Sequence, residues 1–195
     1  MGEPFGGQAA GRGLSSVFRR FRFSPAGAGE DGAVVSKRFR GEWRHKVDGK
    51  GRVSVPAPFR KVLETGDPDW REDMPQKLIL IYGRHPGCLE GHTVEGAAYL
   101  DSLIEGMPRF SPERKALSRM ISTQSVELEV DPGGRLVLSK ALRDRVGITD
   151  EAMFVGMTDT FEIWSPPAYE ADAEALDLSG DAYVLLQEVE AKRSP

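Results

Sequence analysis

Residues 47–60 read VDGKGRVSVPAPFR, and a closely related stretch, VDPGGRLVLSKALR, follows 83 positions later at residues 130–143. The two copies share the Asp, the second Gly and the Arg of a short turn, the apolar alternation that follows it, and the final Arg. An internal repeat indicates that the chain contains two copies of one structural unit. We therefore take this repeat as the feature that decides the fold.

Each copy has the pattern of a tight β-hairpin. The first turn begins at Asp48 and reaches Gly51, and the second begins at Asp131 and reaches Gly134. The Asp side chain is expected to accept hydrogen bonds from backbone N–H groups, and the Gly to adopt a positive φ. The alternating apolar residues after each turn predict a strand that returns alongside the first.

Helices and further strands complete the two units. A short helix is predicted to open at Pro56 and at Ser139, because Pro suits the first helical turn and Ser caps it. Residues 78–82 and 152–155 predict buried strands. The sequence also predicts a helix over 93–105, a second that opens with Ser-Pro-Glu at 111–113, and a charged helix or pair over 167–192.

The repeat also predicts the domain organisation. Two half-units of about 45 residues are each too small to bury a core alone, so we expect them to pair into one α+β, β-rich, barrel-like domain with a pseudo-twofold axis. The predicted parts are a disordered basic extension at 1–38, a first repeat at 42–92, a helical spacer at 93–124, a second repeat at 125–168 and a C-terminal helical tail at 169–195.

The charge of the chain is unevenly distributed. Its 195 residues carry a formal net charge of −4, but the segment from Arg12 to Lys61 is +9 and the residues after Lys61 are −12. This asymmetry indicates one surface for a polyanion and another that keeps the protein soluble. The alternative is a basic tail without a partner. A single cysteine excludes an internal disulfide, and no run of 18 apolar residues predicts a membrane span, so a cytoplasmic protein is expected.

Catalytic signatures are weak in this sequence. It contains no Gly-x-Ser-x-Gly, no Walker A loop, no His-Glu-x-x-His and no Gly-x-Gly-x-x-Gly between a strand and a helix. His85, Cys88 and His92 lie close together and could suggest a metal site, but three ligands without a Cys-x-x-Cys partner are a poor match to one. We predict no enzyme activity, no metal or other cofactor and no small-molecule substrate, and keep an enzyme built on these three residues as a rival.

The two turn arginines are the strongest candidates for function. Arg52 and Arg135 occupy equivalent places in the two hairpins, and a guanidinium can pair with guanine in the DNA major groove or with a phosphate. A two-stranded ribbon fits that groove. Equally, each Arg could serve only to pair with the Asp of its turn, and both roles can hold together. Candidate phosphate contacts near the turns are Arg44, Lys46, Lys50 and Lys140.

In order and spacing, these motifs resemble the MraZ family, bacterial regulators related to the AbrB/SpoVT class. The resemblance covers residues 39–169. It is carried by Phe39-Arg40-Gly41, the first turn with Val55-Pro56 and Phe59-Arg60, the second turn with Leu142-Arg143, and Val155-Gly156 with Phe161-Glu162-Ile163-Trp164.

The resemblance implies a double-split, swapped-hairpin β-barrel made of two AbrB-like halves. It implies a homo-oligomeric ring that binds short direct repeats of double-stranded DNA upstream of its own operon, the division and cell-wall gene cluster, in the nucleoid. Arg52 and Arg135 are then the residues that face the DNA. The second turn departs from the pattern at Pro132 and Gly133. Two explanations are open for the residues before Phe39. They form a basic arm that adds phosphate contacts, or translation starts later and they are not part of the protein. The rival in another class is an AbrB-like antitoxin or scaffold that binds a partner protein.

Overall fold

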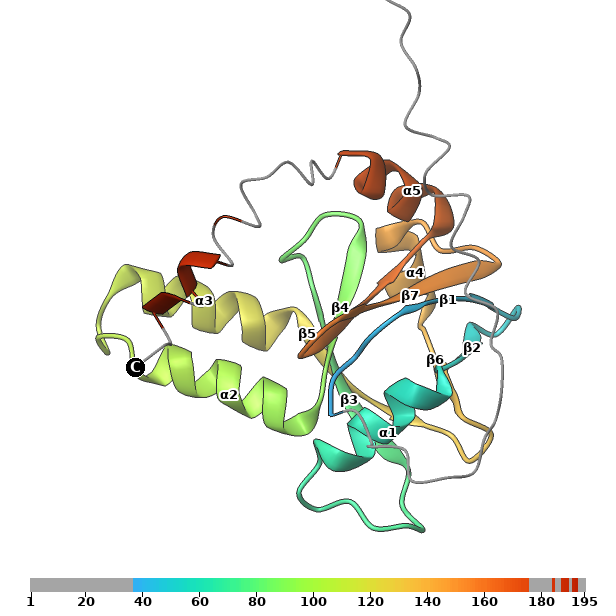
Figure 1. Ribbon diagram of the computed structural model, residues 1–195, viewed down its shortest axis with the longest axis horizontal. Coiled ribbons are helices and arrows are strands. Elements are labelled where there is room, and N and C mark those ends of the chain that lie inside the picture. The colour runs from blue at the N-terminus through green and yellow to red at the C-terminus, as the bar shows by residue number, and fades with distance from the viewer. Residues whose placement is uncertain (1–36, 176–183, 185–186, 190, 193–195) are drawn as a thin grey trace, which may run out of the picture. The chain divides into compact units, whose positions relative to one another are not determined.

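The structure is a computed structural model, and it describes residues 37–175, 184, 187–189 and 191–192 (Figure 1). These residues belong to one compact unit, Val35–Pro195. The extension predicted at 1–38 lies outside the described residues except for its last two, and so does much of the end of the predicted tail.

Residues 37–175 form eight strands and five helices, and residues 187–189 are also helical. In chain order, the elements of residues 37–175 are β1 (Glu42–Lys46), β2 (Arg52–Ser54), α1 (Ala57–Thr65), β3 (Gln76–Tyr82), β4 (Cys88–His92), α2 (Val94–Glu105), α3 (Pro112–Thr123), β5 (Ser125–Val130), β6 (Arg135–Val137), α4 (Lys140–Val146), β7 (Glu151–Met157), β8 (Thr160–Trp164) and α5 (Pro166–Ala175). The predicted helix over 93–105 is α2, and the helix predicted from Ser111 is α3. No helix in the described part of the chain combines the length and apolar character that a membrane crossing requires.

The strands form two antiparallel sheets. The larger has the order β1-β7-β8-β4-β3-β5, and β2 pairs with β6 in the smaller. The order of the large sheet is symmetric between the two copies of the repeat. If each strand is replaced by its counterpart in the other copy (β1 by β5, β3 by β7 and β4 by β8), the same order is obtained, read from the opposite edge. Each strand that leads into a repeated turn therefore pairs with a strand from the other half of the chain.

The small sheet is joined to both edges of the large one. Through the two turns, the N–H of Asp48 donates to the carbonyl of Arg52 (3.0 Å), and the N–H of Asp131 donates to that of Arg135 (2.7 Å). These bonds hold β1 against β2 and β5 against β6. The α+β class is thus confirmed, whereas the strand ladders by themselves form an open six-stranded sheet and a separate pair.

The main core lies where the two halves meet. Phe39, Phe59, Phe154 and Phe161 are almost fully buried, and their ring centroids are 4.9–6.5 Å apart along the contacting pairs. Full burial of such a side chain stabilises the fold by about 1.5–3 kcal/mol. Because β2 alternates, its central residue Val53 points into this core while its neighbours point outward.

A smaller cluster joins helices α2 and α3 to the sheet. Helices α2 and α3 lie side by side (Figure 1), and Ile104 and Ile121 pack with Ile81 of β3. The side chain of Thr93 caps α2 and that of Ser111 caps α3, each accepting a hydrogen bond from a backbone N–H in the first helical turn. Polar caps thus fix the start of both helices.

Candidate nucleic-acid interface

The first turn is held by the carboxylate of Asp48. One oxygen accepts hydrogen bonds from the backbone N–H groups of Lys50 and Arg52, both at 2.9 Å. The other accepts from Nε of Arg52 at 2.6 Å. Gly51 has φ +81°, and a Cβ at this position would overlap the carbonyl oxygen of Leu138. Asp48 thus accepts hydrogen bonds from the backbone of its own turn, and Gly51 adopts the positive φ of that turn.

These contacts stabilise the ionised form of Asp48. The backbone N–H of Arg52, followed by its side chain, lowers the pKa of Asp48 from its ordinary value to about 2. At neutral pH the carboxylate is therefore a fixed negative charge, and it sets the direction of the Arg52 guanidinium.

The second turn has the same design with a looser ion pair. Asp131 accepts a hydrogen bond from the backbone N–H of Arg135 at 3.0 Å, and its other oxygen lies 3.5 Å from Nε of Arg135. Gly134 has φ +74°. The backbone N–H of Arg135 is the main cause that lowers the pKa of Asp131. The ion pair is longer here, so the second arginine is held less closely than the first.

The register of the small sheet brings the two arginines onto one surface. Arg52 lies opposite Val137, and Arg135 lies opposite Ser54, whereas Val53 lies opposite the buried Leu136 on the other face. The arginines are therefore diagonal neighbours on one two-stranded ladder, a relation that places Cα atoms about 7–8 Å apart. Their side chains are 41% and 45% exposed. Two cationic side chains thus project together from a rigid ribbon.

The other predicted cations differ in their surroundings. Lys50 is exposed on the first turn, and Lys46 is exposed at the end of β1. Arg44 forms an ion pair of 2.7 Å with Glu151 across the β1–β7 ladder, and this contact raises its pKa. Lys140 pairs with Asp144 on α4. Arg44 and Lys140 therefore already have acidic partners within the described chain.

Two residues near the turns were missed by sequence reasoning. Arg60 of α1 lies against Gly134, and Arg143 of α4 lies against Gly51. Each arginine thus contacts the turn of the other copy. The sequence feature that could have indicated them is the Arg that ends both copies of the repeat. The sequence alone does not show which of the two turns each Arg contacts.

The three residues that could suggest a metal site, His85, Cys88 and His92, are not arranged as one. Cys88 is buried, and burial raises the pKa of its thiol to about 12. His92 is also buried, with Nε2 2.7 Å from a carboxylate oxygen of Glu90, while His85 is exposed. Among the described residues, no group of three or more His, Cys, Asp or Glu is arranged to hold a metal ion.

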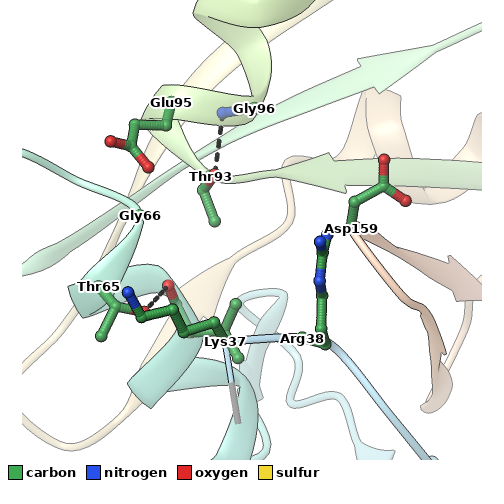
Figure 2. A pocket seen from close by; sticks show the side chains of 9 residues that line it. Lys37, Arg38, Thr65, Gly66, Thr93, Glu95, Gly96 and Asp159 are labelled. Carbon is green, nitrogen blue, oxygen red and sulfur yellow. Dashed lines mark hydrogen bonds between the residues drawn. The ribbon is translucent and has the colours of Figure 1, made fainter. Parts of the chain in front are cut away.

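A polar cavity of about 270 Å³ lies near the start of α2 (Figure 2). Its wall includes the cations Lys37 and Arg38 and the carboxylates Glu95 and Asp159. The hydroxyl of Thr93 accepts a hydrogen bond of 2.9 Å from the backbone N–H of Gly96, in the first turn of α2. Opposite charges balance one another here, so this cavity has no evident preference for an anion.

Comparison with known proteins adds to this geometry. The sequence profile of the family described as "MraZ protein, putative antitoxin-like" matches residues 121–181. A protein of Ruegeria pomeroyi named "Transcriptional regulator MraZ" is 48% identical over 139 residues, which cover 71% of this chain and 83% of the relative. This chain belongs to the MraZ family.

Two further relatives bear the same name. The protein from Rhodospirillum rubrum is 38% identical over 146 residues, or 72% of this chain and 88% of its own. The protein from Cereibacter sphaeroides is 35% identical over 159 residues, or 78% of this chain and 91% of its own. These names describe regulators of transcription, which confirms the predicted family and the prediction of a regulator in place of an enzyme.

Proposed function

We propose that this MraZ family member is a sequence-specific regulator that binds double-stranded DNA with the outer face of the β2–β6 ladder. The observation that carries the proposal is the register that projects Arg52 and Arg135 from one face of one ribbon. A two-stranded ribbon fits the major groove, and arginine is suited to bidentate contact with guanine. The Asp48 contact uses Nε of Arg52, and a bidentate base contact can be made by the two Nη groups, so the ion pair and base recognition are compatible.

The remaining cations are proposed to contact phosphates. Lys50 and Lys46 are exposed beside the first turn and would orient the ribbon without reading sequence. Arg44 and Lys140 would first have to exchange Glu151 and Asp144 for a phosphate. We therefore rank Lys50 and Lys46 ahead of these two as backbone contacts.

We also propose that the two sheets form a swapped-hairpin barrel. Besides the bonds through the turns, the N–H of Val55 donates to Gly134 (2.9 Å), and that of Leu138 donates to Gly51 (2.8 Å). These equivalent bonds support a continuous circuit β1-β2-β6-β5 that connects the edges of the large sheet. The symmetric order of the large sheet supports a division of the chain into two repeats, at 42–92 and 125–168. The spacer at 93–124 then lies between them in the sequence, and the tail at 169–195 follows them.

The proposed assembly is a homo-oligomeric ring in the cytoplasm, associated with the nucleoid. The chain carries a net charge of −4, so a single ribbon would bind DNA weakly, but several ribbons on one rim would act together. Exposed apolar side chains on and between α2 and α3 offer a surface for subunit contacts. They are Tyr99, Leu103, Phe110 and Leu117. The DNA target we propose is a set of short direct repeats upstream of the chain's own operon, in the division and cell-wall gene cluster.

Footprinting on the DNA upstream of the chain's own gene, repeated across a salt series, tests this function. We expect protection of evenly spaced short repeats that is lost steeply as salt rises, because each phosphate contact releases counterions. Smooth protection without phasing would contradict sequence-specific binding. Absence of protection would contradict DNA binding by this chain alone.

The words "antitoxin-like" in the family description favour one second candidate. In that case the chain binds a partner protein and DNA binding is secondary. Tight co-purification of a second chain, combined with weak DNA binding by the isolated protein, would support this alternative over the first.

A further inference from the structure

Arg60 and Arg143 occupy equivalent places in the two halves. They are 83 positions apart, like the turns themselves, and each is the fourth residue of its helix, α1 or α4. Both are half-buried. Equivalent burial of two long cationic side chains indicates a shared structural task.

Each of these arginines lies against the turn of the opposite copy. A Cβ built on Gly134 would be 2.9 Å from Cζ of Arg60, and one built on Gly51 would be 3.0 Å from Nε of Arg143. Nε of Arg143 also donates to the carbonyl of Leu138 at 3.2 Å, and the N–H of Leu138 donates to Gly51. The first turn is therefore linked to α4, and the second turn to α1.

The two arginines differ in one respect. Nε of Arg143 has the carbonyl of Leu138 as its partner, whereas Nε of Arg60 is buried and has no hydrogen-bond partner among the described residues. The contact of Arg60 with its turn is therefore made by packing of the planar guanidinium against a glycine that carries no side chain. Lysine has no such plane, so it is a poor substitute at this position.

We propose that Arg60 and Arg143 are positioning residues, each of which holds the DNA-contacting turn of the opposite repeat. Arg60 holds the turn that carries Arg135, and Arg143 holds the turn that carries Arg52. The link to DNA rests on the function proposed above, while the bracing itself is a property of the DNA-free protein.

Hydrogen exchange of the DNA-free protein tests the bracing. Arg60→Met should speed exchange several-fold at the amides of the second turn, residues 131–135, and leave those of the first turn, residues 48–52, unchanged, and Arg143→Met should do the reverse. Arg119→Met, on the exposed side of α3, is the matched control and should change neither turn. Faster exchange in the turn of the same copy, or no change in either turn, would overturn the proposal.

A conservative variant guards against loss of the fold. Arg60→Lys keeps the positive charge and the apolar stem but lacks the guanidinium plane, so it should speed exchange about as much as Arg60→Met, and again only at residues 131–135. A uniform rise in exchange across the sheet in both variants would show that Arg60 supports the whole fold and would overturn a role specific to one turn.

A double-mutant cycle on DNA affinity tests the functional link. Arg60→Met and Arg135→Ala should be non-additive, with a coupling of about 2- to 100-fold in Kd, the range for residues that act together. Arg60→Met and Arg52→Ala should be additive. Additivity in both pairs would overturn the link. If Arg52→Ala and Arg135→Ala each leave affinity unchanged, the proposed DNA site is wrong, and the exchange experiment still decides the bracing.

Discussion

The two repeated turns have the same shape but not the same charge. In the first, Asp48 accepts three hydrogen bonds from Lys50 and Arg52, and a lysine stands at the tip. In the second, Asp131 holds Arg135 across 3.5 Å, and glycine replaces the lysine. The residues that fix the backbone are thus duplicated, whereas the lysine that we propose as a phosphate contact is present in one copy. This comparison separates what the turn needs to fold from what it needs to bind.

Substitution of the turn glycines should give the largest difference in stability. Gly51→Ala introduces a Cβ at φ +81° that overlaps a backbone carbonyl, so it should reduce the free energy of unfolding by at least about 1–3 kcal/mol. Gly134→Ala should cost less, because its Cβ meets the end of the Arg60 side chain. Urea unfolding of the two variants measures both values.

Gly49→Ala is the control within the first turn, since a Cβ there has no neighbour within 4 Å and φ is not positive. It should change the free energy of unfolding by less than about 1 kcal/mol. If Gly134→Ala is as costly as Gly51→Ala, the two turns are equally constrained and the proposed difference is wrong.

Much of the local structure could be predicted from the sequence. Turn residues and caps act over a few positions, so the hairpin at Asp48, the cap at Ser111 and the helix that begins after Ser139 follow from local rules. The pairing of β1 with β7 could not be predicted in the same way. A repeat shows that two segments are equivalent, but it does not show which distant strand each one joins.

The candidate site was only partly predictable for the same reason. Arg52 and Arg135 stand out because the repeat preserves them. Their common face depends on the β2–β6 register, which sequence periodicity does not specify. The pairing of Arg44 with Glu151 joins residues 107 positions apart. Long-range contacts thus give Arg44 an acidic partner and bring Arg60 and Arg143 against the turns, and neither contact follows from the sequence.

Removal of either turn arginine should weaken DNA binding, and the loss should be larger for the first turn than for the second. We expect Arg52→Ala to weaken specific binding by about 1–3 kcal/mol, and Arg135→Ala to weaken it toward the lower end of that range. The first guanidinium is held more closely, so less ordering is required when DNA binds. Titration of each folded variant with a specific duplex measures the difference, with Arg119→Ala as the control. Unchanged affinity for Arg52→Ala would contradict its assignment.

The lysine at the first tip should contribute through phosphate contact alone. Lys50→Gln should reduce the slope of log Kd against log salt by about 0.9 for each phosphate that the lysine neutralises, and should weaken specific and nonspecific binding alike. Lys115→Gln, exposed on α3, should leave the slope unchanged. A weakening confined to the specific duplex would instead indicate that Lys50 reads a base.

The smallest expected difference concerns the titration of the two turn carboxylates. Contacts from Arg52 hold the pKa of Asp48 at about 2, and contacts from Arg135 lower that of Asp131. A carboxyl whose folded pKa lies below its unfolded value near 3.9 stabilises the fold above that pH, and this contribution is lost as the pH falls through the folded pKa. As the pH falls from about 4 toward 2, we expect the second turn to lose its ionised carboxylate first.

Carbon-13 NMR of the side-chain carboxyls resolves this order. Asp131 should titrate at the higher pH, and the amide signals of Gly134 should move before those of Gly51. Asp48→Asn and Asp131→Asn assign the two signals, and each should abolish the low-pH shift in its own turn only. If Asp131 titrates below Asp48, then the closer Arg52 contact does not make the first carboxylate the more acidic one, and the proposed difference in how firmly the two arginines are held is wrong.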